Sequence, residues 1–366
     1  MSDRRASGSE QVVFTGCGVD CGGRCVLRVH LRDGRITRVE TDDGEEPQYR
    51  ACARGRAARQ SVYSPDRLRF PLKRVGERGQ GRFERISWDE ALDTVAAGLK
   101  RVKETCGPAA ILYRGSGPNG VFHNNRPAFR LLNMFGGCTT TWGNISNGAS
   151  IFASMASYGT MSTGNTRDDL VNSRLILMWG WNPACTIWDT NTPFDIIKAR
   201  EAGARIVCID PRFTDSAALF ADRWIPIRPA TDVAMLLAMA YVMIEEGLCD
   251  QKFLNAYTIG FDKFRDYVMG TEDGLARTPA WAESITGVSA TTIESLAREY
   301  AASRPAALIA GWAPGRTAYG EQYHRAAIAL AAMTGNIGIH GGNAAGWERS
   351  YPNQTPRVPV GINPVD

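Results

Sequence analysis

Hydrophobic and polar residues in the second half of the chain form short apolar runs that alternate with segments of helical spacing. The apolar runs 174–179, 204–210 and 306–310 have the length and composition of buried strands. Helices are expected over 193–201, between the first two runs, and over 319–333, after the third. This order predicts a βαβ unit whose parallel strands are covered on both faces.

The first third of the chain has a different pattern, in which short alternating segments flank a turn signal. Residues 25–31 and 35–40 alternate loosely, and the Asp-Gly pair at 33–34 between them is typical of a β-hairpin. Cysteine and glycine are frequent around this hairpin. We therefore predict a small β-unit that carries the cysteines.

A long helix should follow this β-unit. Ser87 and Glu90 have the spacing of a helix capping box, and apolar residues then recur at helical intervals. The Gly-Pro pair at 107–108 ends the helix, and a buried strand is expected over 109–113. A second, strongly apolar helix is predicted over 232–246.

Composition narrows the class of protein. The chain has 366 residues, 44% of them hydrophobic, which suffices for two or more domains. Its 42 basic and 38 acidic residues leave a net charge of +4, too mild to indicate a nucleic-acid partner. No apolar stretch is long enough to span a bilayer. The first residues lack an apolar run, so we expect a cytoplasmic protein as the sequence is written.

Four cysteines form the strongest chemical signal. Three of them lie within nine residues and the fourth arrives from far along the chain, in the order Cys17, Cys21, Cys25 and Cys52. A cubane cluster has four irons that each need one outer ligand, and four-cysteine sets hold such clusters. Zinc sites usually take their ligands as two short pairs. The spacing favours a [4Fe–4S] cluster over a zinc knuckle or buried free cysteines.

Arginines surround the fourth cysteine. Arg50, Arg54 and Arg56 all lie within four residues of Cys52. Guanidinium groups would stabilise the negative charge of a thiolate-bound cluster and raise its reduction potential. The alternative is an ordinary basic surface loop.

An ordered series of segments resembles the molybdopterin oxidoreductases of the dimethyl sulfoxide reductase family, and the likeness extends over nearly the whole chain. These segments are 17–52, 54–56, 63–68, 71–76 and 83–91. The resemblance is greatest to catalytic subunits of membrane-associated reductases for S- and N-oxides. It implies a mixed α/β protein in which a small β-rich Fe–S domain precedes α/β nucleotide-cofactor domains with a parallel sheet.

The domain boundaries implied in this way divide the chain into four segments. We expect a [4Fe–4S] domain over 1–70 and part of an α/β pterin domain over 71–165. A domain that binds molybdopterin guanine dinucleotide is expected over 166–340, and a loop or tail over 341–366. Catalytic subunits of the family are much longer than this chain, so a domain that closes over the cofactor is expected to be missing.

The resemblance also implies a function. It is two-electron oxygen-atom transfer, in which a sulfoxide, an N-oxide or a related oxyanion is reduced with electrons relayed through the [4Fe–4S] cluster. The cofactor would be molybdenum held by two molybdopterin guanine dinucleotides. The implied partners are an Fe–S electron-transfer subunit and a membrane anchor subunit, at the periplasmic face if an export signal has been lost. The alternatives are an Fe–S electron-transfer protein and a non-catalytic remnant.

Two residues acquire specific roles through the resemblance. Ser146 lies where the family places a side-chain ligand to molybdenum, although Ile145 stands where an aromatic residue is often found. Arg54 occupies a position between the cluster and the pterin, which implies a role in electron transfer. From the residues alone, Ser146 could instead cap a helix that starts at Asn147. The resemblance also makes Cys138 an alternative ligand.

Some of the remaining predicted site residues, over 179–183 and 210–212, follow strand ends, where ligands bind in open α/β sheets. The others lie in segments over 228–232, 311–316 and 335–338 that resemble family segments near the cofactor. An Asp at a strand end can accept N–H groups from guanine, and Asn or Arg can reach pyrophosphate or pterin. For Asp232 the alternative is a plain helix N-cap. The predicted cofactor-binding residues are Trp179, Gly180, Asn182, Pro183, Asp210, Pro211, Arg212, Thr231, Asp232, Gly311, Trp312, Arg316 and Asn336.

Overall fold

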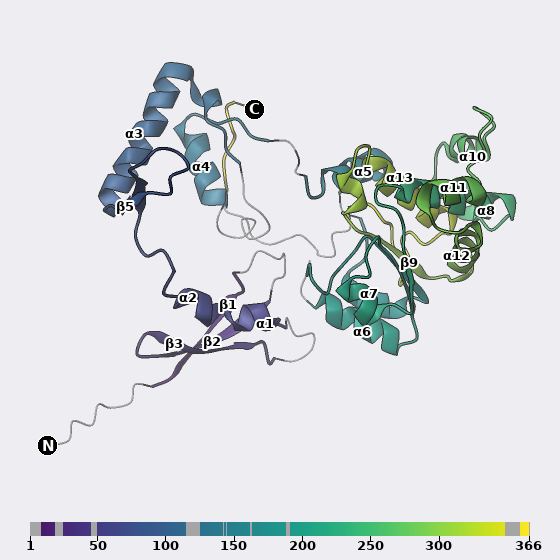
Figure 1. Ribbon diagram of the computed structural model, residues 1–366, viewed down its shortest axis with the longest axis horizontal. Helices are drawn as coiled ribbons and strands as arrows, with labels where there is room; N and C mark the ends of the chain where they lie inside the picture. The colour runs from purple at the N-terminus through teal and green to yellow at the C-terminus, as the bar shows by residue number, and fades with distance from the viewer. Residues whose placement is uncertain are drawn as a thin grey trace. The chain divides into compact units, whose positions relative to one another are not determined.

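The computed structural model describes residues 9–18, 25–44, 50–114, 125–141, 143, 145–161, 163–187, 191–347 and 359–365. The chain forms two compact units (Figure 1). The first comprises Met1–Trp142 together with Gln354–Asp366, and the second comprises Gly143–Asn353. The finer division into four segments remains a prediction.

The first unit begins with the small β-sheet that the sequence predicts. Strands β1 (Gln11–Gly16), β2 (Val26–Arg32) and β3 (Arg35–Thr41) are antiparallel, in that order. Asp33 and Gly34 form the turn between β2 and β3 with φ angles of 52° and 74°, which is the backbone region that an Asp-Gly turn supplies. The predicted hairpin is therefore confirmed.

Short helices and a second hairpin complete this unit. Helices α1 (Ala53–Arg56) and α2 (Ala58–Val62) pack against β3, and β4 (Leu72–Arg74) pairs with β5 (Phe83–Arg85). They are followed by α3 (Trp88–Cys106), which ends before Gly107 as predicted, and by α4 (Asn125–Phe135). A small core between α3 and α4 is formed by Ile111, Leu132 and Cys138.

The predicted buried strand over 109–113 is wrong. Pro108–Ala110 forms a turn of 3₁₀ helix, and a single parallel bridge joins Leu112 to Thr139. Leu112 is 61% exposed. Proline fixes its own φ angle near the helical value, so the Gly-Pro pair continues into a helical turn. The apolar run that follows is then too short to build a strand.

The second unit contains a parallel four-stranded sheet. Its strands are β6 (Leu175–Trp179), β7 (Arg205–Ile209), β8 (Arg223–Ile225) and β9 (Ala306–Ala310), in the spatial order β8-β7-β6-β9. All four are in parallel register with their neighbours. The predicted parallel α/β sheet is confirmed, and three of its strands are the three apolar runs.

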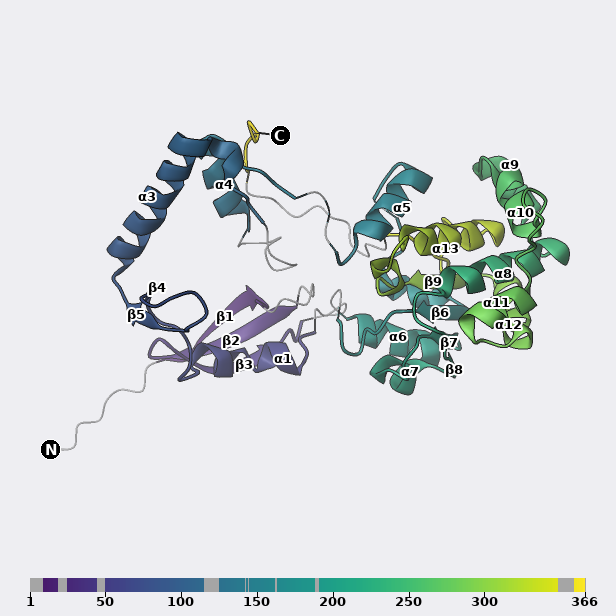
Figure 2. The ribbon, with the colours of Figure 1, turned by 45° about the horizontal axis from the view of Figure 1, so that its top comes forward.

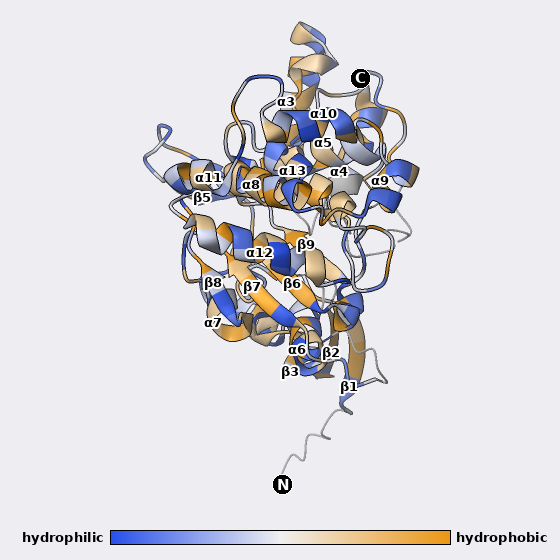
Figure 3. Ribbon diagram, turned by 90° about the vertical axis from the view of Figure 1, so that its right-hand side faces the viewer, coloured by the Kyte–Doolittle hydropathy of each residue, from blue (hydrophilic) through white to orange (hydrophobic). Residues whose placement is uncertain are grey.

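Helices cover both faces of this sheet (Figure 2). Helices α6 (Thr192–Glu201) and α7 (Asp215–Phe220) pack on one face, and α8 (Asp232–Glu245), α12 (Ala290–Ala302) and α13 (Glu321–Met333) form the core on the other. Alternate residues of β6, β7 and β9 enter the two cores, so these strands are hydrophobic apart from Arg205 at the start of β7 (Figure 3). Full burial of both faces explains the continuous apolar runs.

Further helices extend the second unit around the N-terminal half of α13 and around α8. Helix α5 (Gly148–Tyr158) packs on α13, while α10 (Phe261–Met269) and α11 (Pro279–Thr286) pack on α8. Helix α9 (Gln251–Tyr257) contacts α13. Among the described residues, no helix is long and apolar enough to cross a membrane.

The strand order contains a reversal that positions a ligand site. The chain passes from β6 to β7 to β8 on one side, and it then returns to place β9 on the other side of β6. Ligands of open α/β sheets bind in the crevice beyond the carboxyl ends of the strands at such a reversal.

Candidate cofactor site

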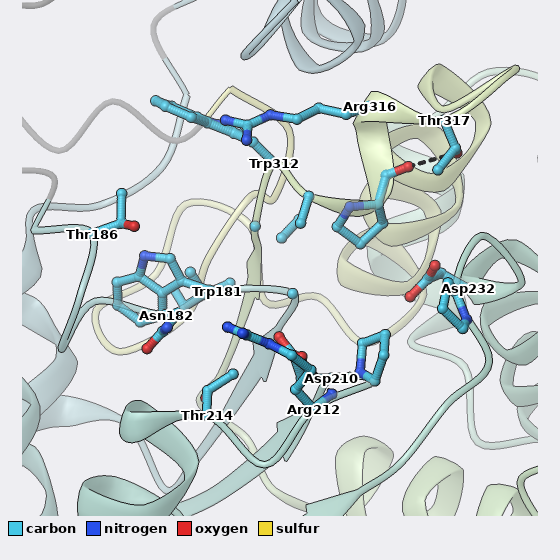
Figure 4. A pocket seen from close by; sticks show the side chains of 18 of the residues that line it. Trp181, Asn182, Thr186, Asp210, Arg212, Thr214, Asp232, Trp312, Arg316 and Thr317 are labelled. Atoms are coloured by element: carbon cyan, nitrogen blue, oxygen red, sulfur yellow. Dashed lines mark hydrogen bonds between the residues drawn. The ribbon is translucent and has the colours of Figure 1, made fainter.

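A pocket of about 490 Å³ lies at the carboxyl ends of the strands, where the strand order reverses (Figure 4). The loops after β6, β7 and β9 and the N-terminus of α8 all contribute to it. Nine of the thirteen predicted cofactor-binding residues line this pocket. They are Gly180, Asn182, Asp210, Pro211, Arg212, Asp232, Gly311, Trp312 and Arg316.

Two glycines allow the loops after β6 and β9 to approach each other. A β-carbon on Gly180 would lie 2.5 Å from Cδ of Pro314, and one on Gly311 would collide with the carbonyl group of Gly180. Gly180 also has a φ of 58°, which disfavours other residues. Both positions therefore need glycine for the pocket wall to close.

Asp210 and Arg212 form a turn directly after β7 that faces the pocket. The backbone N–H of Arg212 donates to Oδ1 of Asp210 at 2.9 Å, and the indole N–H of Trp224 donates to the Asp210 carbonyl at 2.9 Å. Burial raises the pKa of the Asp210 carboxyl, although the Arg212 N–H and guanidinium oppose this rise. Hydrogen-bond donors on a ligand would stabilise the carboxylate.

Asp232 presents a second buried carboxylate to the pocket. It is the first residue of α8 and is 6% exposed. The indole N–H of Trp179, at the end of β6, donates to its Oδ1 at 2.8 Å. Burial raises the pKa of Asp232 despite this bond. The N-cap of α8 is Thr231, so the alternative reading of Asp232 as the cap is not what the structure shows.

Asn182 fixes the loop after β6 to the start of α7. Its Oδ1 accepts hydrogen bonds from the hydroxyl and the backbone N–H of Ser216, at 2.6 and 3.3 Å. The same Ser216 hydroxyl accepts from the backbone N–H of Ala184 at 2.9 Å. The amide group therefore shapes the pocket as well as lining it.

Ser146 is connected to this pocket through Arg316. The Nε of Arg316, which lines the pocket, donates to the carbonyl oxygen of Ser146 at 3.2 Å. Helix α5 starts at Gly148 with Asn147 as its N-cap residue, so Ser146 does not cap the helix. The side chain of Ser146 is exposed and stands just ahead of the helix.

Four predicted cofactor residues lie outside the pocket lining. Trp179 is fully buried and positions Asp232, and Pro183 is buried behind the loop. The Thr231 hydroxyl donates to the Arg228 carbonyl. Asn336 is fully buried, and its Oδ1 accepts from the Ala306 N–H at the start of β9 at 2.9 Å. These four residues stabilise the pocket region and do not line the pocket itself.

The structure adds lining residues that the sequence did not indicate. Arg167 is 6% exposed, lines the pocket and places its guanidinium over the ring of Trp181, 4.8 Å from the centroid. With Arg212 and Arg316 it gives the pocket three cationic groups. Because Arg167 lies in a 3₁₀ turn ahead of β6, no strand-end signal marks it.

The cysteines of the first unit are placed by its sheet. Gly16 pairs with Val26 at the end of β1 and β2, so Cys17 and Cys25 face each other across the same hairpin end. The Cys17 N–H donates to the Cys25 carbonyl at 2.9 Å. Cys21 lies outside the described residues, in the loop between them.

The fourth cysteine is brought to this hairpin by helix α1. Cys52 directly precedes α1, and a β-carbon on Gly55 within that helix would lie 3.3 Å from Sγ of Cys17. In the described part of the chain, no three metal-ligating side chains converge as they would on a single ion. Arg54 lies exposed on the same helix.

Cys138 is fully buried within the first unit. Its backbone N–H donates to Oδ1 of Asn363 at 3.0 Å, and its carbonyl accepts from Nδ2 of the same residue at 2.8 Å. Its surroundings are the small apolar core between α3 and α4. This burial gives no support to Cys138 as an alternative metal ligand.

Comparison with known protein families identifies the family of this chain. Residues 10–64 match the molybdopterin oxidoreductase Fe4S4 domain, and residues 67–362 match the molybdopterin oxidoreductase family. The chain belongs to the molybdopterin oxidoreductases. The chain therefore contains an Fe4S4 domain and a molybdopterin oxidoreductase domain.

Curated relatives are reductases. A putative dimethyl sulfoxide reductase chain of Escherichia coli K12 is 42% identical over 97% of this chain and 47% of its own length. The dimethyl sulfoxide reductase of the same organism is 41% identical over the same shares. A trimethylamine-N-oxide reductase of Haemophilus influenzae is 34% identical over 91% of this chain and 42% of its own. The chain spans about half the length of these relatives.

A solved structure shares the fold. Acetylene hydratase from Pelobacter acetylenicus superposes with a TM-score of 0.69 at 26% identity, over 91% of this chain and 44% of that one. Its name denotes addition of water, whereas the relatives above are named as reductases. The fold alone therefore does not determine the reaction.

Proposed function

We propose that this chain is the cofactor-bearing part of a molybdenum-dependent reductase that removes an oxygen atom from a sulfoxide, an amine N-oxide or a related oxyanion. The sequence identity to reductases exceeds the identity to the hydratase by a wide margin. The oxide, two electrons and two protons would give the reduced substrate and water. When bound, the molybdopterin cofactor supplies the two-electron chemistry, since molybdenum cycles between Mo(IV) and Mo(VI).

The hydrogen bond between Arg316 and Ser146 is the observation that carries this proposal. It supports the proposal because it joins the segment that contains Ser146 to a pocket whose charged and polar lining suits a nucleotide. Within that pocket Arg167, Arg212 and Arg316 would hold the pyrophosphate, because guanidinium groups match phosphate oxygens. The hydroxyl of Ser146, as an alkoxide, would be a hard ligand suited to oxidised molybdenum.

The two pocket carboxylates would select the base. Asp210 and Asp232 are both mostly buried, and this burial raises the pKa of both carboxyls. Guanine presents adjacent N–H donors that would stabilise either carboxylate. Adenine lacks this paired donor edge, so we propose that the pocket prefers guanine nucleotides.

Electrons would enter through the first unit. Cys17, Cys21, Cys25 and Cys52 would hold the [4Fe–4S] cluster, and the exposed Arg54 would lie on the path from cluster to pterin. An Fe–S electron-transfer subunit and a membrane anchor subunit are the partners we propose, with the assembly at the periplasmic face.

The test is the cofactor content of the chain purified without oxygen. We expect about four irons, about four sulfides and about one molybdenum per chain, with guanine released on denaturation. Iron without molybdenum or guanine would instead support an Fe–S electron-transfer protein. A folded chain with none of them would indicate a non-catalytic remnant.

A matched pair of cysteine variants makes the iron measurement specific. Cys25→Ser should lose most of the iron, because Cys25 is buried beside Cys17 at the hairpin end. Cys106→Ser, at the exposed end of α3, should keep it. Equal iron in both variants would exclude the proposed ligand set.

A further inference from the structure

The turn Pro314–Arg316 is clamped on several sides. Pro314 packs against Gly180 at the end of β6. The next residue, Gly315, fits between two side chains: a β-carbon there would lie 2.5 Å from Nε2 of His324 and 3.4 Å from the β-carbon of Ala149. The turn therefore has no room to shift toward α13 or α5.

His324 forms one wall of this clamp. It lies on α13, is 1% exposed, and its Nδ1 has no hydrogen-bond partner among the described residues. Burial lowers the pKa of His324 to about 3, so the ring is neutral at any working pH. A buried polar atom without a partner disfavours folding, and an apolar side chain would avoid this cost. Stability alone thus does not account for the histidine.

The clamp is connected to the metal-ligand segment by two contacts. Arg316, at the end of the turn, donates to the Ser146 carbonyl at 3.2 Å. Ala149, whose β-carbon would contact a β-carbon on Gly315 at 3.4 Å, lies in the first turn of α5, three residues after Ser146. A movement of the turn would therefore displace Ser146 relative to the pocket.

We propose that His324 is a positioning residue for the Ser146 segment, acting through Gly315 and Arg316. The imidazole ring sets the position of the turn, and the turn sets the distance between the proposed molybdenum ligand and the nucleotide pocket. This inference rests on the proposed role of Ser146, but the mechanical coupling that it describes belongs to the chain without cofactor.

Hydrogen–deuterium exchange of the full chain tests the coupling directly. Gly315→Ala should push the turn away from the His324 ring, and His324→Ala should remove that ring. Each should speed exchange about tenfold in 148–151 and in 314–317, where the Ile151 and Arg316 N–H groups are hydrogen-bonded to Asn147 and Ala313. The double variant G315A/H324A should return exchange in both segments to within about threefold of the wild type, since the new methyl group fills space left by the ring.

Gly270→Ala provides the matched control. A β-carbon on Gly270 would lie 2.5 Å from the backbone of Leu275, a collision as close as that at Gly315, but at the end of α10. It should lower thermal stability and leave exchange at 148–151 unchanged. If His324 had only a structural role, His324→Ala would likewise lower thermal stability and leave exchange at 148–151 unchanged.

Binding of guanosine diphosphate, used as a probe, separates this inference from the proposed function. If exchange changes together at 148–151 and 314–317 and G315A also binds the probe more weakly, the positioning role and the nucleotide pocket are both supported. Coupled exchange in a wild-type chain that binds no probe would contradict the nucleotide pocket and leave the positioning role standing. If His324→Ala leaves exchange at 148–151 unchanged, or the double variant restores nothing, the positioning role is wrong.

Discussion

At the scale of one residue, Asp232 is a buried carboxylate that lowers the folding stability of the chain at neutral pH but could bind a nucleotide. Its carboxylate is buried at the start of α8, and the Trp179 indole is its one hydrogen-bond donor from another side chain among the described residues. Burial raises the pKa of Asp232, so its contribution to stability is present below the unfolded pKa of about 3.9 and is lost as the pH rises through the folded value.

Asp232→Asn should therefore stabilise the chain without cofactor. The amide oxygen can still accept from Trp179, and no charge is buried at neutral pH. We expect the free energy of unfolding at pH 7 to rise by about 1 kcal/mol, with the gain vanishing toward pH 3. The variant should also bind guanosine diphosphate at least about tenfold more weakly, since one acceptor becomes a donor.

The control is Asp262→Asn, an exposed carboxylate in the first turn of α10. It should change stability by only a few tenths of a kcal/mol and leave nucleotide binding unaltered. Chemical denaturation and calorimetry measure both quantities. A destabilised Asp232→Asn with unchanged affinity would show that the carboxylate serves the fold and not the ligand.

The site residues that could be predicted are those next to a strong pattern. Gly180, Asp210 and Gly311 directly follow apolar runs, and the position of a parallel strand fixes what its end faces. Arg167 could not be predicted, because it reaches the pocket from an irregular turn. Asn336 is the opposite case. Its amide side chain could bind a ligand, yet it accepts a hydrogen bond from the Ala306 N–H at the start of β9.

At the scale of elements, Asp169 joins the 3₁₀ helix Arg167–Asn172 to the loop that contains Gly341. Its carboxylate accepts from the Gly341 N–H at 2.8 Å and from the side chains of Asn172 at 3.0 Å and Asn165 at 2.5 Å, and its Oδ1 lies 2.8 Å from Nδ1 of His340. Burial alone would raise the pKa of Asp169, but these bonds together outweigh it and lower the pKa.

Asp169→Ala should lower the free energy of unfolding by roughly 1–2 kcal/mol at pH 7, since the buried Gly341 N–H and the partly buried Asn165 amide lose their acceptor. A lowered folded pKa gives stability that is present above about pH 3.9 and is lost as the pH falls through the folded value. The difference from wild type should therefore shrink in acid. Asp168→Ala, its exposed neighbour, should show little change at either pH.

The capping box of α3 is only half formed. The Ser87 hydroxyl accepts from the Glu90 N–H at 3.1 Å, but the Glu90 carboxylate contacts Lys73 at 3.0 Å instead of reaching back to Ser87. Ser87→Ala should cost about 1 kcal/mol, seen as faster hydrogen exchange in the first turn of α3. Glu90→Gln, which keeps the Ser87 bond, should cost less.

The bounds of elements with one clear hydrophobic pattern could be predicted from the sequence. The bounds of elements that depend on tertiary contacts could not. The strands β6, β7 and β9 and the helix α8 lie within one or two residues of their predicted bounds. Helix α13 starts at Glu321 rather than 319, because Tyr319 adopts a φ of 57° and Gly320 fits tightly against Gly315. The helices between 251 and 302 are short and mixed in pattern, so packing on α8 and α13 defines them.

At the scale of the whole molecule, each unit has a hydrophobic core of its own. The core of the first unit is small, with three buried residues between α3 and α4, whereas the second unit has extensive cores on both faces of its sheet. Burial of apolar area is the main source of stability. The first unit should therefore be much the less stable of the two, unless its cluster contributes.

We accordingly expect two unfolding transitions, with the first unit melting at the lower temperature. Ser87→Ala should lower only the first transition. Ser289→Ala, which removes the hydroxyl that accepts from the Thr292 N–H at the start of α12, should lower only the second. Each cap is worth about 1 kcal/mol, so each should shift its own transition by a few degrees.

Removal of iron then reports where the cluster stabilises the protein. A metal site that forms only in the folded state adds its binding free energy to folding. A chelator applied to the iron-loaded chain should thus lower the first transition and leave the second in place, as calorimetry would show. A chelator that moved both transitions together would mean that the two units unfold as one cooperative body. If neither moved, the cluster would not contribute to the stability of the cysteine-bearing sheet.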